Sequence, residues 1–491
     1  MSTYAGIDLG TSGIKIALID DAGTCLASAA RKSPVDIPHP GWSQQDPDQW
    51  WRLTVEIFDQ LAAEEPSLMA RLAGVSLSGH MLGQVLIDRE DRPTTPCILW
   101  NDQRSIMECA ELLARVPDIG WRTNGAPDPG LTAPKLLWLA RHAPDALDRA
   151  DMLLLPKDYV RLMLTGERYS EVTDASGTMM LDCATGTWDE SLVEAAGWDM
   201  SRLPPLLASY EAAGSLKPEL CRRWSCPADV PVAAGSGDNY AGALGIGAAL
   251  PGRAALSIGT SGVLSAVDGS FHPAPEKAIL TTPHAAPNTF LSMAVVMSAT
   301  QSLDWLANIT GTSPADLAAL AEDRIRERGI AGRPLARPSI TGVRTPDNRP
   351  DATAFFGGIV AAHDKADLAY SVLEGVAFQF FDGMRAQRAS GVLIDEISAV
   401  GGGTRSALWI TLLATLFDRP MALPEGGSIS ACLGAARLAK VAAEPQQRDA
   451  ILRERPAILA TVEPEANLRE VLLERFQSYL ALPFLAAPDP A

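Results

Sequence analysis

A short turn of small residues near the N-terminus follows an aspartate, and the same turn occurs again half a chain later. Asp8 precedes the first turn, and Ser257 precedes the second. Backbone N–H groups in such a turn can approach a phosphate, and a neighbouring carboxylate can hold Mg²⁺ through water. The alternative is a plain hairpin with an aspartate at a strand end, but the repeat favours a phosphate clamp. The turn residues expected at phosphate are Gly10, Thr11, Ser12, Gly259, Thr260 and Ser261.

Asp238 is the candidate general base. It follows a predicted strand over 230–234 and a Gly-Ser-Gly turn. Open α/β sheets bind ligands beyond the carboxyl ends of their strands, which is where this carboxylate falls. The alternative is an N-cap aspartate for the next helix. The position of Asp238 at the junction between two chain halves favours the base, because clefts form at domain junctions.

Two further segments carry polar or glycine-rich chemistry. Gly401–Ser406 links a strand to a helix, and its glycines would let a nucleotide approach the backbone. Trp100–Arg104 combines an aromatic ring with amide, carboxylate and guanidinium groups, which suits a sugar; the alternative is a cap for a helix over 102–113. His80 follows a strand and fits a substrate loop or a structural role equally well. The chain has no Walker phosphate loop and no protein-kinase motif set.

The elements that must position these residues alternate between strand and helix. Apolar residues alternate on both sides of each small-residue turn, which predicts two hairpins. The periodicity then predicts an α/β architecture, with two domains of common ancestry over 1–245 and 246–491. A Pro- and Arg-rich stretch over 333–350 is expected to be a long surface loop facing the cleft. The other predicted elements are a strand at 24–30, a helix from Asp46-Pro47 with a capping box to Gln49, a strand at 75–78, a helix over 367–388, a strand at 397–400 and a helix around 408–416.

Composition excludes several functional classes. The chain has 491 residues and a net charge of −18, so nucleic acid and anionic membranes are unfavourable partners. Its seven cysteines are scattered and form no CxxC pair, which argues against zinc or a disulfide framework and favours the cytoplasm. No uncharged apolar run reaches membrane-spanning length. The oligomeric state is left open, with a homodimer as one option.

Together these motifs resemble those of the FGGY family of carbohydrate kinases, and within it most closely the xylulokinases. The resemblance covers nearly the whole chain. The matching segments are Ile7–Gly13, Pro40–Pro47, Trp50-Trp51, Gly130–Trp138, Leu155–Tyr159, Leu164–Glu167, Gly237–Asn239, Ser257–Gly262 and Gly401–Ser406.

The resemblance implies two actin-like ATPase domains of ribonuclease-H-like topology that flank a catalytic cleft. It implies transfer of the ATP γ-phosphoryl group to a sugar hydroxyl, with D-xylulose, giving D-xylulose 5-phosphate, as first choice. By analogy, Asp238 takes the hydroxyl proton and Asp8 helps to place Mg²⁺. The nucleoside would be lined by Gly402, Gly403 and Ser406, and the sugar would be faced by Met81, Leu82, Trp100, Asp102, Asp238 and Asn239.

Two departures from the xylulokinase pattern bear on the substrate. Leu82 stands where the family has a sugar-contacting histidine, and Val343 stands where it has a glutamate. A leucine cannot hydrogen-bond a hydroxyl, so a pocket with this change discriminates differently among sugars. The alternatives are a kinase for another ketose or polyol, and, from a different class, an actin-like nucleotide switch or sugar sensor without kinase activity. The latter would have lost its base or gained a further domain.

Overall fold

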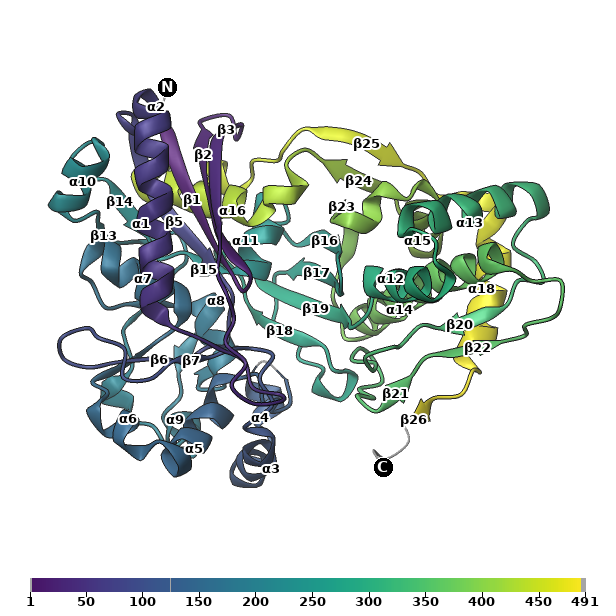
Figure 1. The fold of residues 1–491 in the computed structure, drawn as a ribbon, viewed down its shortest axis with the longest axis horizontal. Helices are drawn as coiled ribbons and strands as arrows, with labels where there is room; N and C mark the ends of the chain where they lie inside the picture. The colour runs from purple at the N-terminus through teal and green to yellow at the C-terminus, as the bar shows by residue number, and fades with distance from the viewer. Residues whose placement is uncertain (1, 124, 487–491) are drawn as a thin grey trace.

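The computed structural model describes residues 2–123 and 125–486, which form two lobes side by side (Figure 1). Each lobe is built around a seven-stranded mixed sheet. The first sheet contains β1 (Thr3–Gly10), β2 (Gly13–Asp20), β3 (Cys25–Lys32), β5 (Leu72–Gly79), β13 (Ala212–Ser215), β14 (Pro231–Ala233) and β15 (Ser236–Gly237). The second contains β16 (Gly252–Ile258), β17 (Gly262–Asp268), β18 (Leu280–Pro283), β19 (Phe290–Val296), β23 (Ile394–Val400), β24 (Met421–Pro424) and β25 (Ile458–Val462).

The central strands of the two sheets follow the same order, as the repeated turn predicted, and each sheet has one further strand, β15 in the first and β18 in the second. In the first, β1, β2 and β3 form an antiparallel meander, and β5 and β14 continue in parallel on the other side of β1. In the second, β16, β17 and β19 form the meander, and β23 and β24 continue in parallel beside β16. Both predicted hairpins are therefore confirmed, and each opens one ribonuclease-H-like sheet.

Local sequence explains where the first helix begins. Helix α1 (Pro47–Glu64) has Asp46 as its N-cap and Pro47 in its first turn, as predicted. The cap bond goes from the Asp48 N–H to the Asp46 carboxylate (3.0 Å) rather than forming the expected box with Gln49. Trp50, Ile57 and Leu61 are buried, so the apolar face packs on the first sheet.

The long helix of the second lobe is also confirmed. Helix α14 (Lys365–Ala389) begins with a capping box between Asp364 and Asp367, and it packs against the second sheet with α15 (Ala407–Phe417). The stretch over 333–350 differs from the expected surface loop. It contains the short strand β20 (Leu335–Arg337), and Ser339 and Thr345 are buried. The prolines and arginines suggested exposure, but the segment packs along α14.

Two helices lie between the sheets and join the lobes. Helix α11 (Asp238–Gly245) packs on the second sheet, and α16 (Ser430–Ala443) packs on β1 and β5 of the first, although it belongs to the second half of the sequence. The two helices cross at glycines, because a Cβ at Gly245 would collide with the Ser430 carbonyl and one at Gly434 with the Ala241 carbonyl. This crossing fixes the start of α11 against both lobes.

A smaller group of helices lies on the first lobe, between β5 and β14 in the sequence. It has its own apolar core and includes α3 (Ile106–Arg115), α5 (Thr132–His142) and α9 (Glu190–Ala195). The first of these begins after Ser105, so the predicted start at Asp102 is displaced by the intervening turn. Among the described helices, none combines the length and apolar character needed to span a membrane.

Candidate active site

Asp8 and Asp238 are brought together by the register of three parallel strands. Asp8 on β1 lies opposite Ser78 on β5, and Ser78 lies opposite Ser236 on β15. The three strands therefore end at the same edge of the sheet, and the next residue after β15 is Asp238. Two carboxylates far apart in sequence meet at one strand edge, as the sequence predicted for Asp238.

The surroundings of Asp238 bring its pKa close to neutral pH. It is the first residue of α11, with Gly237 as N-cap, so the N-cap alternative for Asp238 does not apply. Burial, and then the nearby negative charge of Asp8, raises the pKa of Asp238 to about 7. The Asn239 N–H donates to Asp238 Oδ1 (2.7 Å) and holds the carboxylate in place. A base with this pKa is half ionised at neutral pH and gains the proton-transfer driving force that general bases need.

Asp8 offers a carboxylate for a hard cation. Ser78 Oγ donates to Asp8 Oδ1 (3.3 Å), and burial raises the pKa of Asp8. In the described part of the chain no three His, Cys, Asp or Glu side chains gather closely enough to form a metal cage. A single carboxylate is still what Mg²⁺ commonly takes from a protein when nucleotide phosphates and water complete its shell. The donor set at Asp8 therefore fits Mg²⁺ held together with ATP.

The first small-residue turn has its carbonyls tied back into the protein. Gln45 Nε2 donates to the Thr11 carbonyl (2.9 Å), and the Ser33 N–H donates to the Ser12 carbonyl (3.0 Å). Trp50 Nε1 in turn donates to Gln45 Oε1 (3.2 Å), which fixes the amide orientation. Because its carbonyl acceptors are already engaged, the turn presents N–H donors to a ligand. Phosphate oxygens are acceptors, so they need such donors.

The second turn is held in the same way by a helix. The carbonyls of Gly259 and Thr260 accept from the N–H groups of Thr300 (2.9 Å) and Ala299 (2.8 Å), where α12 (Thr300–Thr310) begins. Thr260 and Ser261 are exposed at the tip. In both turns the carbonyls point inward and accept hydrogen bonds from the protein, although the donors differ.

Trp100 connects the candidate sugar loop to the first turn. Its indole Nε1 donates to Thr11 Oγ1 (3.0 Å), while its ring stays half exposed. A Cβ at Gly130 would collide with the Trp100 carbonyl, so the glycine allows the following helix to pack directly beneath this loop. The structure therefore joins two residues that the sequence assigned to different ligands.

Met81 and Leu82 form a short apolar floor, in which Met81 packs on Gly237 and Leu82 packs on Gly177. A Cβ at Gly237 would collide with the Met81 side chain, and a Cβ at Gly177 would collide with the Leu82 side chain. Leu82 adopts a left-handed backbone conformation (φ 76°), which is unusual for a leucine. Its carbonyl accepts from Thr132 Oγ1 (2.9 Å) and Lys135 Nζ (3.0 Å) on α5, so the start of this helix holds the turn.

Asp102, which was predicted to face the sugar, is engaged within the protein. It is fully buried, and its oxygens accept from Arg104 and from the Ser43 N–H (2.6 Å). The Arg104 guanidinium also stacks over the Trp42 ring at 3.9 Å. The expectation that Asp102 faces the sugar is therefore corrected: an aspartate two residues from an arginine pairs with it and anchors the loop that carries Trp100.

The glycine-rich link after β23 lies directly beside the second turn. Gly401 has φ 99° and packs on Ile258 at the end of β16, and a Cβ at Gly403 would collide with the Ile258 side chain. Gly402 is exposed and Gly403 is buried. Ser406 Oγ accepts from the Trp409 N–H (3.3 Å) and caps α15. The structure thus brings the predicted nucleoside loop next to the second phosphate turn, with Gly402 facing outward.

His80 and Asn239, two further candidates from the sequence, lie in opposite environments: His80 is buried and Asn239 is exposed. His80 is buried against the Trp50 ring at a centroid distance of 5.2 Å, and burial lowers its pKa to about 3, so it is a neutral core residue and not a sugar ligand. Asn239 is exposed at the start of α11, where a ligand in the cleft could reach it.

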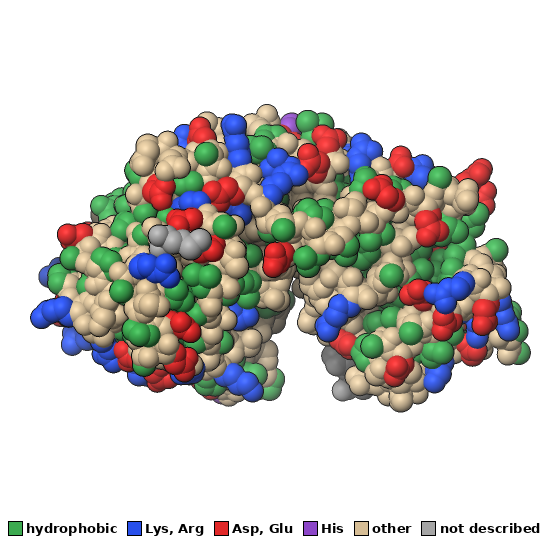
Figure 2. Space-filling model, turned by 90° about the horizontal axis from the view of Figure 1, so that it is seen from above, with side chains coloured by type: hydrophobic (Ala, Val, Ile, Leu, Met, Phe, Trp, Pro, Cys, Tyr) green, Lys and Arg blue, Asp and Glu red, His purple; other side chains and the backbone are tan. Residues whose placement is uncertain are grey.

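The two lobes are separated by a notch in the molecular surface, seen in Figure 2. A cavity of about 130 Å³ lies between them, lined by Gly125–Asp128 of the first lobe and by Val343 and Arg344 of the second. Arg344 forms an ion pair with Asp128 across this gap (3.8 Å). The segment containing Val343 faces the other lobe, as predicted for 333–350.

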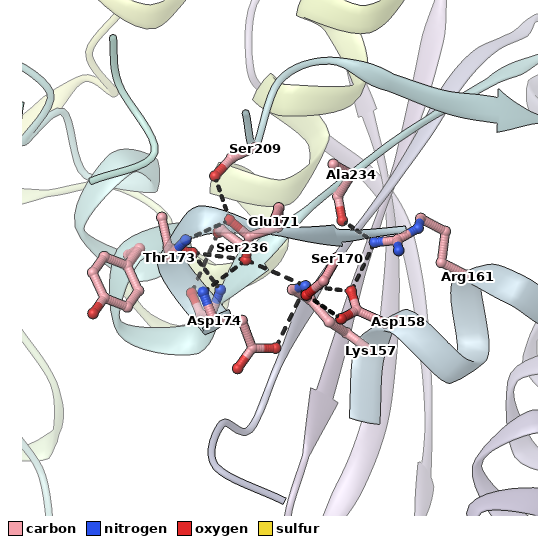
Figure 3. A network of polar contacts seen from close by, with 12 residues as sticks. Lys157, Asp158, Arg161, Ser170, Glu171, Thr173, Asp174, Ser209, Ala234 and Ser236 are labelled. Carbon is pink, nitrogen blue, oxygen red and sulfur yellow. Dashed lines mark hydrogen bonds and ion pairs between the residues drawn. The ribbon is translucent and has the colours of Figure 1, made fainter. Parts of the chain in front are cut away.

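Sequence reasoning missed a buried polar network close to the backbone that leads into Asp238. Lys157, Asp158 and Arg161 on α7 (Pro156–Thr165) are fully buried with Glu171 and Asp174 (Figure 3). The signal was present, since α7 carries three charges inside an otherwise apolar helix. Gln45 lies within the matching segment Pro40–Pro47, but its hydrogen bond to the Thr11 carbonyl depends on tertiary contacts that spacing does not reveal.

With this geometry established, comparison with known proteins identifies the class. Family models describe residues 3–245 as the N-terminal domain and 254–443 as the C-terminal domain of the FGGY family of carbohydrate kinases. The chain belongs to the FGGY family of carbohydrate kinases, and its fold is the two-domain fold of that family.

Individual relatives carry more specific names. A protein named xylulose kinase from Escherichia coli is 41% identical over 90% of this chain and 91% of its own length. One of the same name from Klebsiella pneumoniae is 39% identical over 92% and 93%. A crystal structure described as a xyloylose kinase from Brucella ovis superposes with a TM-score of 0.93 at 42% identity, covering 98% of both chains.

Proposed function

We propose that the protein transfers the γ-phosphoryl group of ATP to D-xylulose and releases D-xylulose 5-phosphate and ADP. The observation that carries the proposal is Asp238, whose pKa is raised to about 7 at a strand edge shared with Asp8. The choice of sugar is supported by the relatives named xylulose kinase, which match about nine-tenths of the chain at 39–41% identity.

Each residue has a defined role in this proposal. Asp238 accepts the proton of the attacking sugar hydroxyl, whose oxygen then bonds to the γ-phosphorus as the bond to the ADP oxygen breaks. The N–H groups of the turns containing Thr11 and Thr260 bind phosphate oxygens. Asp8 would hold Mg²⁺, which when bound would supply positive charge next to the phosphates. Gly402 lies where the backbone can approach the nucleoside, and Ser406 caps the helix that follows.

The division of labour between lobes belongs to the same proposal. We assign the sugar, the base and the first phosphate turn to residues 1–245, and the second turn and nucleoside loop to 246–491. The matching strand orders support this boundary, and α16 shows that one helix of the later segment packs against the earlier sheet. We also propose that the enzyme is cytoplasmic, because all seven cysteines are free thiols.

The test is an assay of ADP formation with purified protein, ATP and Mg²⁺ over a panel of pentuloses, hexuloses and polyols. D-Xylulose is expected to give the highest kcat/KM, and ADP release without sugar is expected to be slow. Omission of Mg²⁺, with excess chelator, should abolish turnover. Sugar-independent ADP release at the full rate, or none with any sugar, would contradict a sugar kinase.

A kinase for another ketose or polyol is the second candidate, and Leu82 favours it. Its apolar side chain packs near Met81 on the apolar floor that the two residues form, where a polar partner for a hydroxyl would otherwise lie. A sugar that lacks or inverts the hydroxyl nearest Leu82 would then outrank D-xylulose in the same panel. Asp238 is present and no further domain accompanies the two lobes among the described residues, which disfavours a nucleotide switch without catalysis.

A further inference from the structure

Several hydrogen bonds hold the backbone that leads into Asp238. The Ala234 carbonyl accepts from Arg161 Nη1 (2.7 Å), and the Gly235 N–H donates to the Ser209 carbonyl (3.0 Å). The Gly237 N–H, immediately before the base, donates to Thr173 Oγ1 (3.1 Å). This last bond fixes the Ser236–Gly237 peptide, one residue before the backbone that carries the Asp238 side chain.

The Thr173 hydroxyl is itself oriented by Glu171. It donates its single proton to Glu171 Oε1 (2.9 Å), which leaves its lone pairs for the Gly237 N–H. Glu171 also accepts from Ser209 Oγ (2.8 Å) and lies 3.2 Å from Lys157 Nζ. Figure 3 shows these side chains converging from α7, from the start of α8 (Val172–Ala175) and from the loop that carries Ser209. The hydroxyl therefore has one preferred direction and cannot rotate freely.

The surrounding charges make this network rigid. Lys157 lies 2.7 Å from Asp158 and 3.4 Å from Asp174, and Arg161 lies 2.8 Å from Asp158. All of these side chains are fully buried, where hydrogen bonds and ion pairs are strong and a broken one is costly. Burial raises the pKa of Asp174 well above its ordinary range, while Lys157 beside it opposes that rise.

We propose that Thr173 is a positioning residue for catalysis: its hydroxyl transmits the rigidity of the buried charge network to the Gly237 peptide and thereby aims Asp238 at the sugar hydroxyl. The inference rests on the proposed function, because it takes Asp238 as the base. Thr173 is fully buried and acts only through Gly237. Small errors in the placement of a reacting group lower rates by up to about 100-fold, which sets the scale of the effect.

The test compares Thr173→Val, which keeps the shape and removes the hydroxyl, with Thr173→Ser, which keeps the hydroxyl. Thr173→Val should lower kcat about 10- to 100-fold with the KM values for sugar and ATP within about twofold, whereas Thr173→Ser should restore kcat to within about threefold. In Thr173→Val the acid limb of the kcat/KM profile should also move to lower pH, because a loosened Asp238 gains water and its pKa falls toward its ordinary value.

Thr415→Val is the matched control. Thr415 is a fully buried threonine in α15 whose hydroxyl likewise accepts a backbone N–H, from Glu465 at 3.0 Å, but it lies in the other lobe. Thr415→Val should lower Tm comparably and leave kcat unchanged. Equal loss of kcat in Thr173→Val and Thr415→Val, no loss in Thr173→Val, or no rescue by Thr173→Ser would overturn the proposal.

Two further measurements keep the test decisive. If Thr173→Val does not fold, Thr173→Ala against Thr173→Ser at reduced temperature replaces it under the same criteria. If the wild-type protein phosphorylates no sugar, the proposed function fails, and with it the catalytic part of this proposal; the hold on the Gly237 peptide is then measured by amide hydrogen exchange. The Gly237 N–H should exchange faster in the variant without the hydroxyl than in Thr173→Ser, and equal exchange would reject the role.

Discussion

Trp100 and Thr11 are hydrogen-bonded to each other, although one belongs to the loop expected at the sugar and the other to the turn expected at phosphate. The indole N–H donates to Thr11 Oγ1 (3.0 Å), so the threonine proton is free to be donated elsewhere. A phosphate oxygen is a suitable acceptor for it. This bond therefore links the surroundings of the sugar to the binding of the nucleotide.

Replacement of Trp100 with phenylalanine should loosen that link. The change retains an aromatic ring and removes the N–H donor, which is worth about 1 kcal/mol. We expect KM for ATP to rise about fivefold, with a smaller effect on kcat. Trp121→Phe is the control, because Trp121 is an equally exposed tryptophan on α4 (Ile119–Arg122) of the same lobe. Equal steady-state constants for the wild type and Trp100→Phe would show that the bond has no role in nucleotide binding.

Leu82→His should change the ranking of sugars. A histidine supplies a hydrogen-bonding group at the apolar floor next to Met81, and it tolerates the left-handed backbone at φ 76° better than leucine does. The substitution is expected to improve kcat/KM for D-xylulose relative to its epimers by about 3- to 10-fold. Measurement over the sugar panel decides the matter, and an unchanged ranking would mean that Leu82 does not face the sugar.

The lobes should approach each other when both ligands bind. The two phosphate turns belong to different sheets, and only Arg344 and Asp128 form an ion pair across the cavity between the lobes in the described part of the chain, at 3.8 Å. Small-angle scattering should show a smaller radius of gyration for the protein with both sugar and a non-hydrolysable ATP analogue than for the protein with either ligand alone. Identical scattering with and without both ligands would argue against closure.

Asp238→Asn should stabilise the free protein above neutral pH. The pKa of Asp238 is raised to about 7, whereas an unfolded aspartate titrates near about 4. The folded state therefore binds the proton more tightly, and ionisation of the folded group opposes folding increasingly from about pH 4 to pH 7 and fully above it. With allowance for partial exposure, the gain is about 1–2 kcal/mol at pH 8 and should vanish near pH 4. Denaturant unfolding at both pH values measures it, and a gain that is the same at both would refute the assigned pKa.

The sequence allowed the strand edge to be predicted but not the packing around it. Small-residue turns flanked by alternating apolar residues can form few structures other than hairpins, so both phosphate turns were predictable, as was the position of Asp238 after a strand. Asp102 was misassigned because an aspartate near a ligand and an aspartate paired with Arg104 have the same local pattern. The place of α16 on the first sheet and the Gly237–Thr173 bond arise from contacts between distant segments, and local spacing does not encode them.

The most direct test of the central claim is the pH dependence of kcat/KM for the best sugar, measured in the wild type and in Asp238→Asn with ATP binding measured in parallel. The wild-type profile should fall with unit slope below an apparent pKa near 7. Asp238→Asn should bind ATP as the wild type does, lose about 10²- to 10⁴-fold in kcat, and lack the acid limb. Near-normal turnover in Asp238→Asn, or the same acid limb in both proteins, would show that Asp238 is not the base.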